Sequence, residues 1–101
     1  MASYEISPEA LDDLLNIEEF VSADSPAAAE RLTDEFFQAF EHLQTWPRSG
    51  HSRTDLTSKP VLFWPVGSYL VIYRLREADS MLQIVAVLVA ARDVPAILER
   101  R

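Results

Sequence analysis

The chain of 101 residues contains no cysteine, only two glycines and a single lysine. Without cysteine it can form neither a disulfide framework nor a thiolate metal site, as is typical of proteins in a reducing cytoplasm. Two glycines are too few for the many tight turns that connect the short strands of a β-sandwich. No apolar run approaches the roughly 20 residues of a membrane span, and the opening MASYEISPEALDD lacks the blocks of a signal peptide. We expect a soluble, cytoplasmic protein without direct membrane contact.

Apolar residues are abundant, at 49% of the chain. This fraction is too high for a disordered segment. A chain of this length can bury roughly two thirds of its unfolded surface, which suits one compact core. Because no repeat or linker interrupts the sequence, residues 1–101 are predicted to form a single domain.

The net charge of −7 is distributed unevenly. Residues 1–47 carry eleven acidic residues against Arg31 alone, a net charge of −10, whereas residues 48–101 have a net charge of +3. The acidic half would be repelled by a nucleic-acid backbone, so any contact with a polyanion must come from the second half. The simpler interpretation, which we favour, is a well-solvated surface on acidic helices.

Two helices are predicted in the acidic half, at residues 8–22 and 26–45. Each is preceded by a serine that can cap it and begins with proline, which the first turn of a helix tolerates. The apolar positions of the first are Leu11, Leu14, Leu15 and Val21, and those of the second are Ala29, Leu32, Phe36, Phe40 and Leu43. The short connection between them predicts an antiparallel hairpin whose seam is mostly leucine and phenylalanine.

Strands are predicted after residue 60, where β-branched and aromatic residues dominate VLFWPVG, YLVIYRLRE and LQIVAVLVA. Residues 3–6 could form a short first strand. The resulting order is β-α-α-β-β-β with a short C-terminal helix. We therefore expect an α+β fold in which the helical hairpin packs on one face of a mainly antiparallel sheet.

Both faces of this sheet are predicted to be apolar. In the fourth strand Leu82, Ile84, Ala86 and Leu88 should oppose Val85, Val87 and Val89. The hairpin covers one face, so either the segment that starts at Asp93 or a partner must cover the other, because monomers rarely expose large apolar patches. That segment is barely two helical turns long, which favours a partner. The partner could be a second copy of the chain, another protein, or both.

Four stretches, YEISPEALDDLLNI, WPRSGHSRTDL, FWPVGSYLVIYRL and VAVLVAARDVPAIL, together resemble the ParE branch of the RelE/ParE toxins of bacterial type II toxin–antitoxin modules. The resemblance covers nearly the whole chain, and the last two stretches are its most specific part. It implies a small toxin that is held inactive by a cognate antitoxin protein encoded beside it. Such an antitoxin would lay helical or extended segments over the toxin in a hetero-oligomer.

The resemblance leaves two mechanisms open. RelE-like members cut mRNA in the ribosome, which requires a base for the 2′-hydroxyl, cations for the phosphorane and an acid for the leaving oxygen. This chain has Lys59 as its only lysine, Val89 where many relatives have histidine, and His51 as the remaining plausible base. ParE-like members inhibit DNA gyrase by binding and need no catalytic residue. We favour gyrase inhibition without catalytic residues or cofactors, with a RelE-like endoribonuclease and a non-toxic homologue as alternatives.

Seven residues are predicted to contact the target or the antitoxin, with nucleic acid contacted only indirectly: Arg48, His51, Arg53, Tyr73, Arg74, Arg76 and Arg92. The first three lie in PRSGHSRTDL, where Pro47 should stop the second helix and Gly50 should allow a turn. Arginines in an apolar strand either close the edge of the sheet or meet a partner's carboxylates.

Other conspicuous residues have structural interpretations. Asp93 precedes the C-terminal segment and is predicted to be its N-cap. Trp46 and Trp64 are expected to pack in the core or at its rim, since stacking sites for bases come with several exposed cations. His42 is expected at the surface, and His42 and His51 lack the spacing of metal ligands.

Overall fold

The computed structural model describes residues 4–101, so that Ser3 of the predicted first strand lies outside the described residues. The elements are β1 (Tyr4–Ile6), α1 (Pro8–Asp24), α2 (Pro26–Thr45), β2 (Leu62–Val66), β3 (Tyr69–Leu75), β4 (Leu82–Val89) and α3 (Val94–Glu99). This order confirms the predicted α+β fold with its short C-terminal helix. No helix in the described range is long and apolar enough to cross a membrane.

The two long helices begin where the sequence predicts. The Ser7 hydroxyl accepts a hydrogen bond from the Ala10 N–H at 3.1 Å, and the Ser25 hydroxyl accepts one from the Ala28 N–H at 3.1 Å. Ser25 is also the last residue of the turn that closes α1, since its own N–H donates to the Val21 carbonyl. A single residue therefore ends one helix and starts the next, which makes the hairpin tight.

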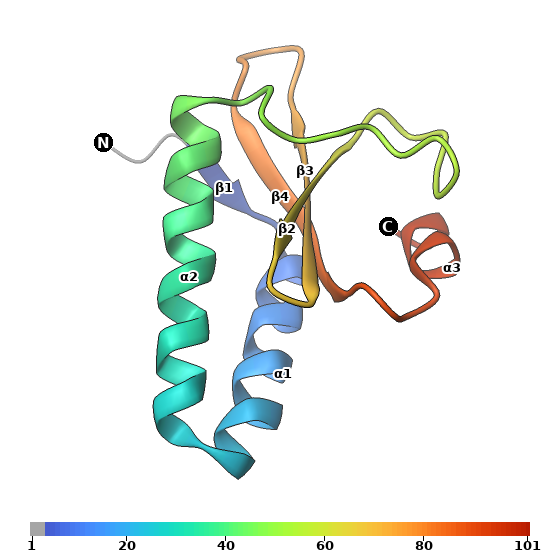
Figure 1. The fold of residues 1–101 in the computed structure, drawn as a ribbon. Helices are drawn as coiled ribbons and strands as arrows, with labels where there is room; N and C mark the ends of the chain where they lie inside the picture. Colours follow the sequence, from blue (N-terminus) through green and yellow to red (C-terminus); the bar gives the residue numbers. More distant parts are fainter. Residues whose placement is uncertain (1–3) are drawn as a thin grey trace.

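The four strands form one sheet in the order β1-β4-β3-β2. β1 pairs with β4 in parallel, and the other two pairings are antiparallel, so the sheet is mainly antiparallel as predicted. In Figure 1, α1 and α2 lie together on one side of the sheet and α3 lies on the other side.

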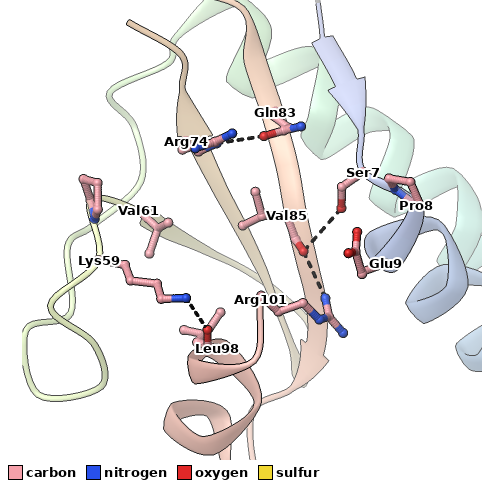
Figure 2. Close-up of a pocket in the computed structure, with 11 residues that line it drawn as sticks. Ser7, Pro8, Glu9, Lys59, Val61, Arg74, Gln83, Val85, Leu98 and Arg101 are labelled. Atoms are coloured by element: carbon pink, nitrogen blue, oxygen red, sulfur yellow. Dashed lines mark hydrogen bonds between the residues drawn. The ribbon is translucent and has the colours of Figure 1, made fainter.

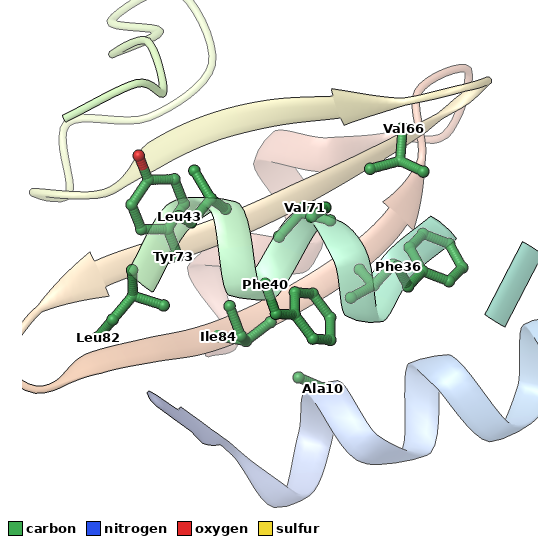
Figure 3. Close-up of a cluster of buried hydrophobic side chains, with 11 residues drawn as sticks. Ala10, Phe36, Phe40, Leu43, Val66, Val71, Tyr73, Leu82 and Ile84 are labelled. Atoms are coloured by element: carbon green, nitrogen blue, oxygen red, sulfur yellow. The ribbon is translucent and has the colours of Figure 1, made fainter. Parts of the chain in front are cut away.

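The main core lies between α2 and the sheet (Figure 3). The predicted apolar stripe of α2 is confirmed, because Phe36, Phe40 and Leu43 are buried there, and they face side chains from all three long strands. These strand residues are Val66 from β2, Val71 and Tyr73 from β3, and Leu82 and Ile84 from β4. The side chains of β3 alternate regularly, since Val71 and Tyr73 belong to this core and Ile72 belongs to the cluster on the other face.

The apolar face of α1 differs from the prediction. Leu11 and Leu15 are 48% and 55% exposed, whereas the buried residue of α1 is Ala10. Leu14 and Ile17 are the larger side chains that pack against the core. Ala10, Leu14 and Ile17 are spaced i, i+4 and i+7 and form the inward face of α1, so Leu11 and Leu15 lie off that face.

The alternation predicted for β4 is wrong beyond Ile84 because the strand contains a bulge. The register with β3 passes from Tyr73 opposite Ile84 to Ile72 opposite Ala86, which leaves Val85 as an extra residue. The extra residue reverses the side-chain alternation. Leu82 and Ile84 consequently belong to the core under the helices, whereas Ala86 belongs to a second cluster on the other face.

The chain itself covers much of this second face, so the alternative of a C-terminal segment holds there rather than the partner that the sequence analysis favoured. Val94 and Leu98 of α3 are buried there in one cluster with Ile72, Ala86 and Val61, and the partly buried Leu56 from the segment before β2 packs against it. Asp93 caps α3 as predicted, accepting a hydrogen bond from the Ala96 N–H at 3.4 Å. Two buried side chains on the short helix α3, together with residues of the long loop before β2, thus cover this cluster.

Candidate interaction surfaces

The loop after α2 is held to the core by Tyr73. This residue is fully buried, and its hydroxyl donates to the Pro47 carbonyl at 2.7 Å and accepts from the Gly50 N–H at 2.9 Å. Burial raises the pKa of Tyr73, with the Gly50 hydrogen bond opposing the shift in part, so the hydroxyl remains a donor. Tyr73 was predicted to contact a partner; its side chain instead lies inside and holds the loop.

Gly50 is required for a different reason from the one predicted. A β-carbon at this position would lie 2.7 Å from a ring carbon of Tyr73 and would overlap its oxygen. Positive backbone φ angles within residues 4–101 occur at Gly67 and Ser80, not at Gly50. The constraint is thus the close approach of the tyrosine, not the geometry of a turn.

The loop that Tyr73 holds, residues 46–51, is called the pinned loop below, and it presents Arg48 and His51 to solvent. The Ser49 N–H donates to the Trp46 carbonyl at 3.0 Å, which closes a turn with Pro47 and Arg48 at its centre. Arg48 is exposed, and its side chain has no hydrogen bond or ion pair within the described chain. The backbone of His51 exchanges two hydrogen bonds with the backbone of Phe63 on edge strand β2, at 2.9 and 2.8 Å. His51 is nevertheless exposed.

Two of the predicted binding arginines are engaged by nearby acids. Arg53 forms a double hydrogen bond with Asp55 at 2.9 and 3.0 Å, and this holds the pKa of the Asp55 carboxyl below its usual range. Arg76 bonds Asp79 at 2.8 Å and Glu5 at 3.2 Å. The charges of Arg53 and Arg76 are therefore compensated within the chain.

Arg74 lies at a cleft of about 340 Å³ on the second face of the sheet (Figure 2). Its Nε donates to Gln83 at 2.7 Å. Lys59 lies across the cleft and donates to the Leu98 carbonyl at 2.6 Å, so it bonds the last turn of α3. Arg101 completes the ring of three cations.

Arg101 also joins three parts of the fold. Its guanidinium forms a double hydrogen bond with Asp13 of α1, at 2.9 and 3.0 Å, and donates to the Val85 carbonyl at the bulge. Asp13 in turn accepts from the Val87 N–H at 3.0 Å. This arrangement was not predicted, because Asp13 and Arg101 lie 88 positions apart and nothing in either local sequence relates them.

Arg92 borders a separate groove at the end of β4. The groove runs between this strand and α1, and Phe20 of α1 lines it with a ring that is 78% exposed. The Arg92 side chain makes no ion pair within residues 4–101 and is exposed. Phe20 was not singled out from the sequence.

A further groove follows the outer side of the helical hairpin. Leu11 and Leu15 of α1 and Phe37 of α2 line it, and all three are exposed. Acidic residues rim it: Glu18, Glu30 and Asp34. The signal for this groove was present in the sequence, since Leu11, Leu14 and Leu15 make an apolar stripe wider than one seam requires.

The predicted contact residues do not form one site. Arg48 and His51 lie on the pinned loop, Arg74 at the cleft on the second face and Arg92 near the end of β4. The two tryptophans also separate: Trp64 packs at the core with His42 stacked on it at 4.9 Å, whereas Trp46 is 61% exposed, contrary to the prediction. Within the described residues, no three His, Cys, Asp or Glu side chains are grouped for a metal.

Comparisons with known proteins agree with this geometry. The sequence profile described as "ParE toxin of type II toxin-antitoxin system, parDE" matches residues 4–94. A solved structure described as "Chromosomal ParDE TA system from P. aeruginosa" superposes with a TM-score of 0.70 at 19% identity, covering 87% of this chain and 95% of that chain. At such low identity the structural likeness shows the fold alone. A comparison with curated proteins found no match to the chain. Because the profile spans nearly its whole length, the chain belongs to the ParE toxin family of type II toxin–antitoxin systems.

Proposed function

We propose that this chain is a toxin that a cognate antitoxin neutralises by laying an amphipathic helix into the groove of Leu11, Leu15 and Phe37. The observation that carries the proposal is the exposure of these three apolar side chains side by side on α1 and α2. Exposed apolar grooves bind the apolar faces of helices. The acidic rim favours a helix with lysine or arginine beside its apolar anchors.

The proposed target is DNA gyrase, which the toxin inhibits by binding. Membership of the ParE family supports this target, as does the chain's poor supply of catalytic groups. His51 and Arg48 are exposed, but the nearby Arg53 is bonded to Asp55, which leaves few free cations to stabilise a phosphorane. Arg48 and Arg92 are unpaired cations at the surface, suited to contacts with a protein target.

Expression and supercoiling assays test the target. Without antitoxin, induction should provoke the DNA-damage response, and the purified protein should block supercoiling by gyrase. Arg48→Glu and Arg92→Glu should weaken both effects, whereas Arg31→Glu, an exposed charge reversal on α2, should not. Normal supercoiling at saturating protein would rule out gyrase. Cleavage of ribosome-bound mRNA that is lost in His51→Ala would establish the nuclease instead, and unimpaired growth would indicate a non-toxic homologue.

Neutralisation is tested separately by co-expression with the product of the adjacent reading frame. Leu15→Glu should leave toxicity intact but prevent rescue, because a charge would enter the apolar groove. Ala27→Glu is the matched control, since residue 27 is exposed on α2 and does not line the groove. Rescue of Leu15→Glu as complete as that of the unchanged toxin would place the antitoxin elsewhere. Sedimentation with and without antitoxin would show whether the toxin self-associates or joins only a hetero-oligomer.

A further inference from the structure

The cleft beside β4 contains cationic groups that the fold does not neutralise. Arg101 is paired with Asp13, but Lys59 and Arg74 bond only a carbonyl and an amide oxygen within residues 4–101. Two positive charges thus face the same cleft without a carboxylate partner. Arg74 uses its Nε for Gln83, which leaves both terminal nitrogens of its guanidinium available.

The floor of the cleft is apolar. Val61 and Leu98, which are 8% and 2% exposed, form it together with Val85. In Figure 2 these side chains lie between Lys59 on one side and Arg101 on the other, with Arg74 above them. A ligand that fits this arrangement needs an aliphatic group for the floor and anionic groups for the surrounding cations.

We propose that the cleft binds an acidic segment of a protein partner, with an aliphatic side chain on Val61 and Leu98 and flanking carboxylates on Arg74 and Lys59. A carboxylate can accept two hydrogen bonds from the free guanidinium nitrogens of Arg74. Lys59 supplies a point charge whose remaining N–H groups are free to donate. The inference rests on the proposed function, because the cognate antitoxin is the partner expected to supply the segment.

A protein carboxylate suits this cleft better than a nucleic-acid phosphate. Glu9 lines the cleft, and both Glu9 and Asp12 are close enough to raise the pKa of Arg101, after the larger effect of its hydrogen bond with Asp13. A continuous polyanion would meet these acids as it left the cleft. A short acidic segment can place its carboxylates on the cations and its aliphatic group on the floor.

This assignment predicts the charge pattern of the antitoxin. The hairpin groove has an acidic rim of Glu18, Glu30 and Asp34 and calls for a basic helix, whereas the cleft lies on the opposite side of the sheet and requires an acidic segment. One partner that occupies both must carry the two charges in separate segments, joined by a connection that passes around the toxin.

The test uses capped pentapeptides and the isotope-labelled full chain, followed by NMR at low salt. Glu-Leu-Glu-Leu-Glu should shift the amide signals of Val61, Arg74 and Val85 saturably, and Lys-Leu-Lys-Leu-Lys should not. Arg74→Gln and Lys59→Gln should each weaken this binding by about fivefold or more, because each removes a charged hydrogen bond. Arg31→Gln, an equal loss of charge on α2, should leave it unchanged. Glu-Asn-Glu-Asn-Glu should bind more weakly because it lacks the aliphatic groups.

Several results would overturn the proposal. The proposal would be refuted if the glutamate peptide bound outside the cleft or did not bind. Equal binding of the lysine peptide would refute the role of the cations, and equal binding of the asparagine peptide would refute the role of the apolar floor. Tighter competition by an oligothymidylate would assign the cleft to nucleic acid, and competition by inorganic phosphate alone would reduce it to a general anion site. The proposed function can be tested independently of this cleft. Leu15→Glu should abolish rescue by the antitoxin without changing peptide binding at the cleft, so either proposal can fail while the other stands.

Discussion

The side chain of Tyr73 occupies the space that a β-carbon at Gly50 would need, and its hydroxyl accepts the Gly50 N–H at 2.9 Å. The same hydroxyl donates to Pro47, so one buried oxygen fixes both sides of the turn that presents Arg48. A loop held in this way loses little conformational entropy on binding. Its rigidity suits a surface that recognises a protein rather than one that closes over a substrate.

Replacing Tyr73 by phenylalanine should destabilise the protein by about 1–3 kcal/mol, because the Pro47 carbonyl and the Gly50 N–H lose their partner. Urea denaturation measures the change. Tyr69→Phe is the matched control: the Tyr69 hydroxyl makes no hydrogen bond within residues 4–101, and its ring would keep the contact with Phe36. Equal stability of the two variants would show that the Tyr73 hydroxyl does not hold the loop.

The ion pair of Asp13 and Arg101 should stabilise the fold more than an ordinary surface pair. Their side chains are only 13% and 19% exposed, and Asp13 also accepts the Val87 N–H. A double-mutant cycle with Asp13→Ala and Arg101→Ala should give a coupling energy of about 1–3 kcal/mol by chemical denaturation. Exposed pairs give about 0–1 kcal/mol. The more exposed pair of Arg53 and Asp55 provides the comparison, and equal coupling for both pairs would contradict the expectation.

The carboxyl of Asp79 should titrate below the ordinary value of 3.8, because Arg76 and then the Met81 N–H donate hydrogen bonds to it. A pKa lowered in the folded state gives stability that is present above the unfolded value and is lost as the pH falls through the folded value. In Arg76→Gln the pKa of Asp79 should rise but stay partly lowered by Met81. NMR titration measures the pKa values of Asp79 and Asp55. The pKa of Asp55, which is bonded to Arg53, should be unchanged in this variant.

Two phenylalanines should respond very differently to replacement by alanine. Phe40 is fully buried in the main core, and Phe40→Ala should cost about 3–5 kcal/mol of stability. Phe20 is 78% exposed, so Phe20→Ala should change the free energy of unfolding by less than about 0.5 kcal/mol. Thermal and urea unfolding measure both. A large loss of stability for Phe20→Ala would show that its ring serves the fold rather than a binding surface.

The fold was predictable where local sequence features control structure. The serine and proline pairs at Ser7 and Ser25 set the starts of both helices, because their capping groups act within one turn. The strands of residues 62–89 followed from side-chain composition, and their short connections left antiparallel pairing as the simplest arrangement. Resemblance then identified the family before any contact was known.

The binding surfaces were less predictable, because exposure depends on what packs nearby. Arg48 and Arg76 look alike in the sequence, yet one is unpaired and the other is bonded to Asp79 and Glu5. Leu11 and Leu14 also look alike, yet Leu14 shares the inward face of α1 with the buried Ala10, whereas Leu11 lies off this face and is 48% exposed. No local sequence pattern predicts these differences in pairing and exposure.

The sequence by itself determined the helical hairpin, the strands that follow it and the family, since capping, periodicity and composition act over a few neighbouring residues. Only the tertiary structure decided which apolar residues stay exposed, that α3 and the loop cover the second face, and which cations remain unpaired. The bulge at Val85 and the bond between Asp13 and Arg101 are two examples of the physical reason. Both depend on backbone groups and side chains that meet only after distant parts of the chain have packed together.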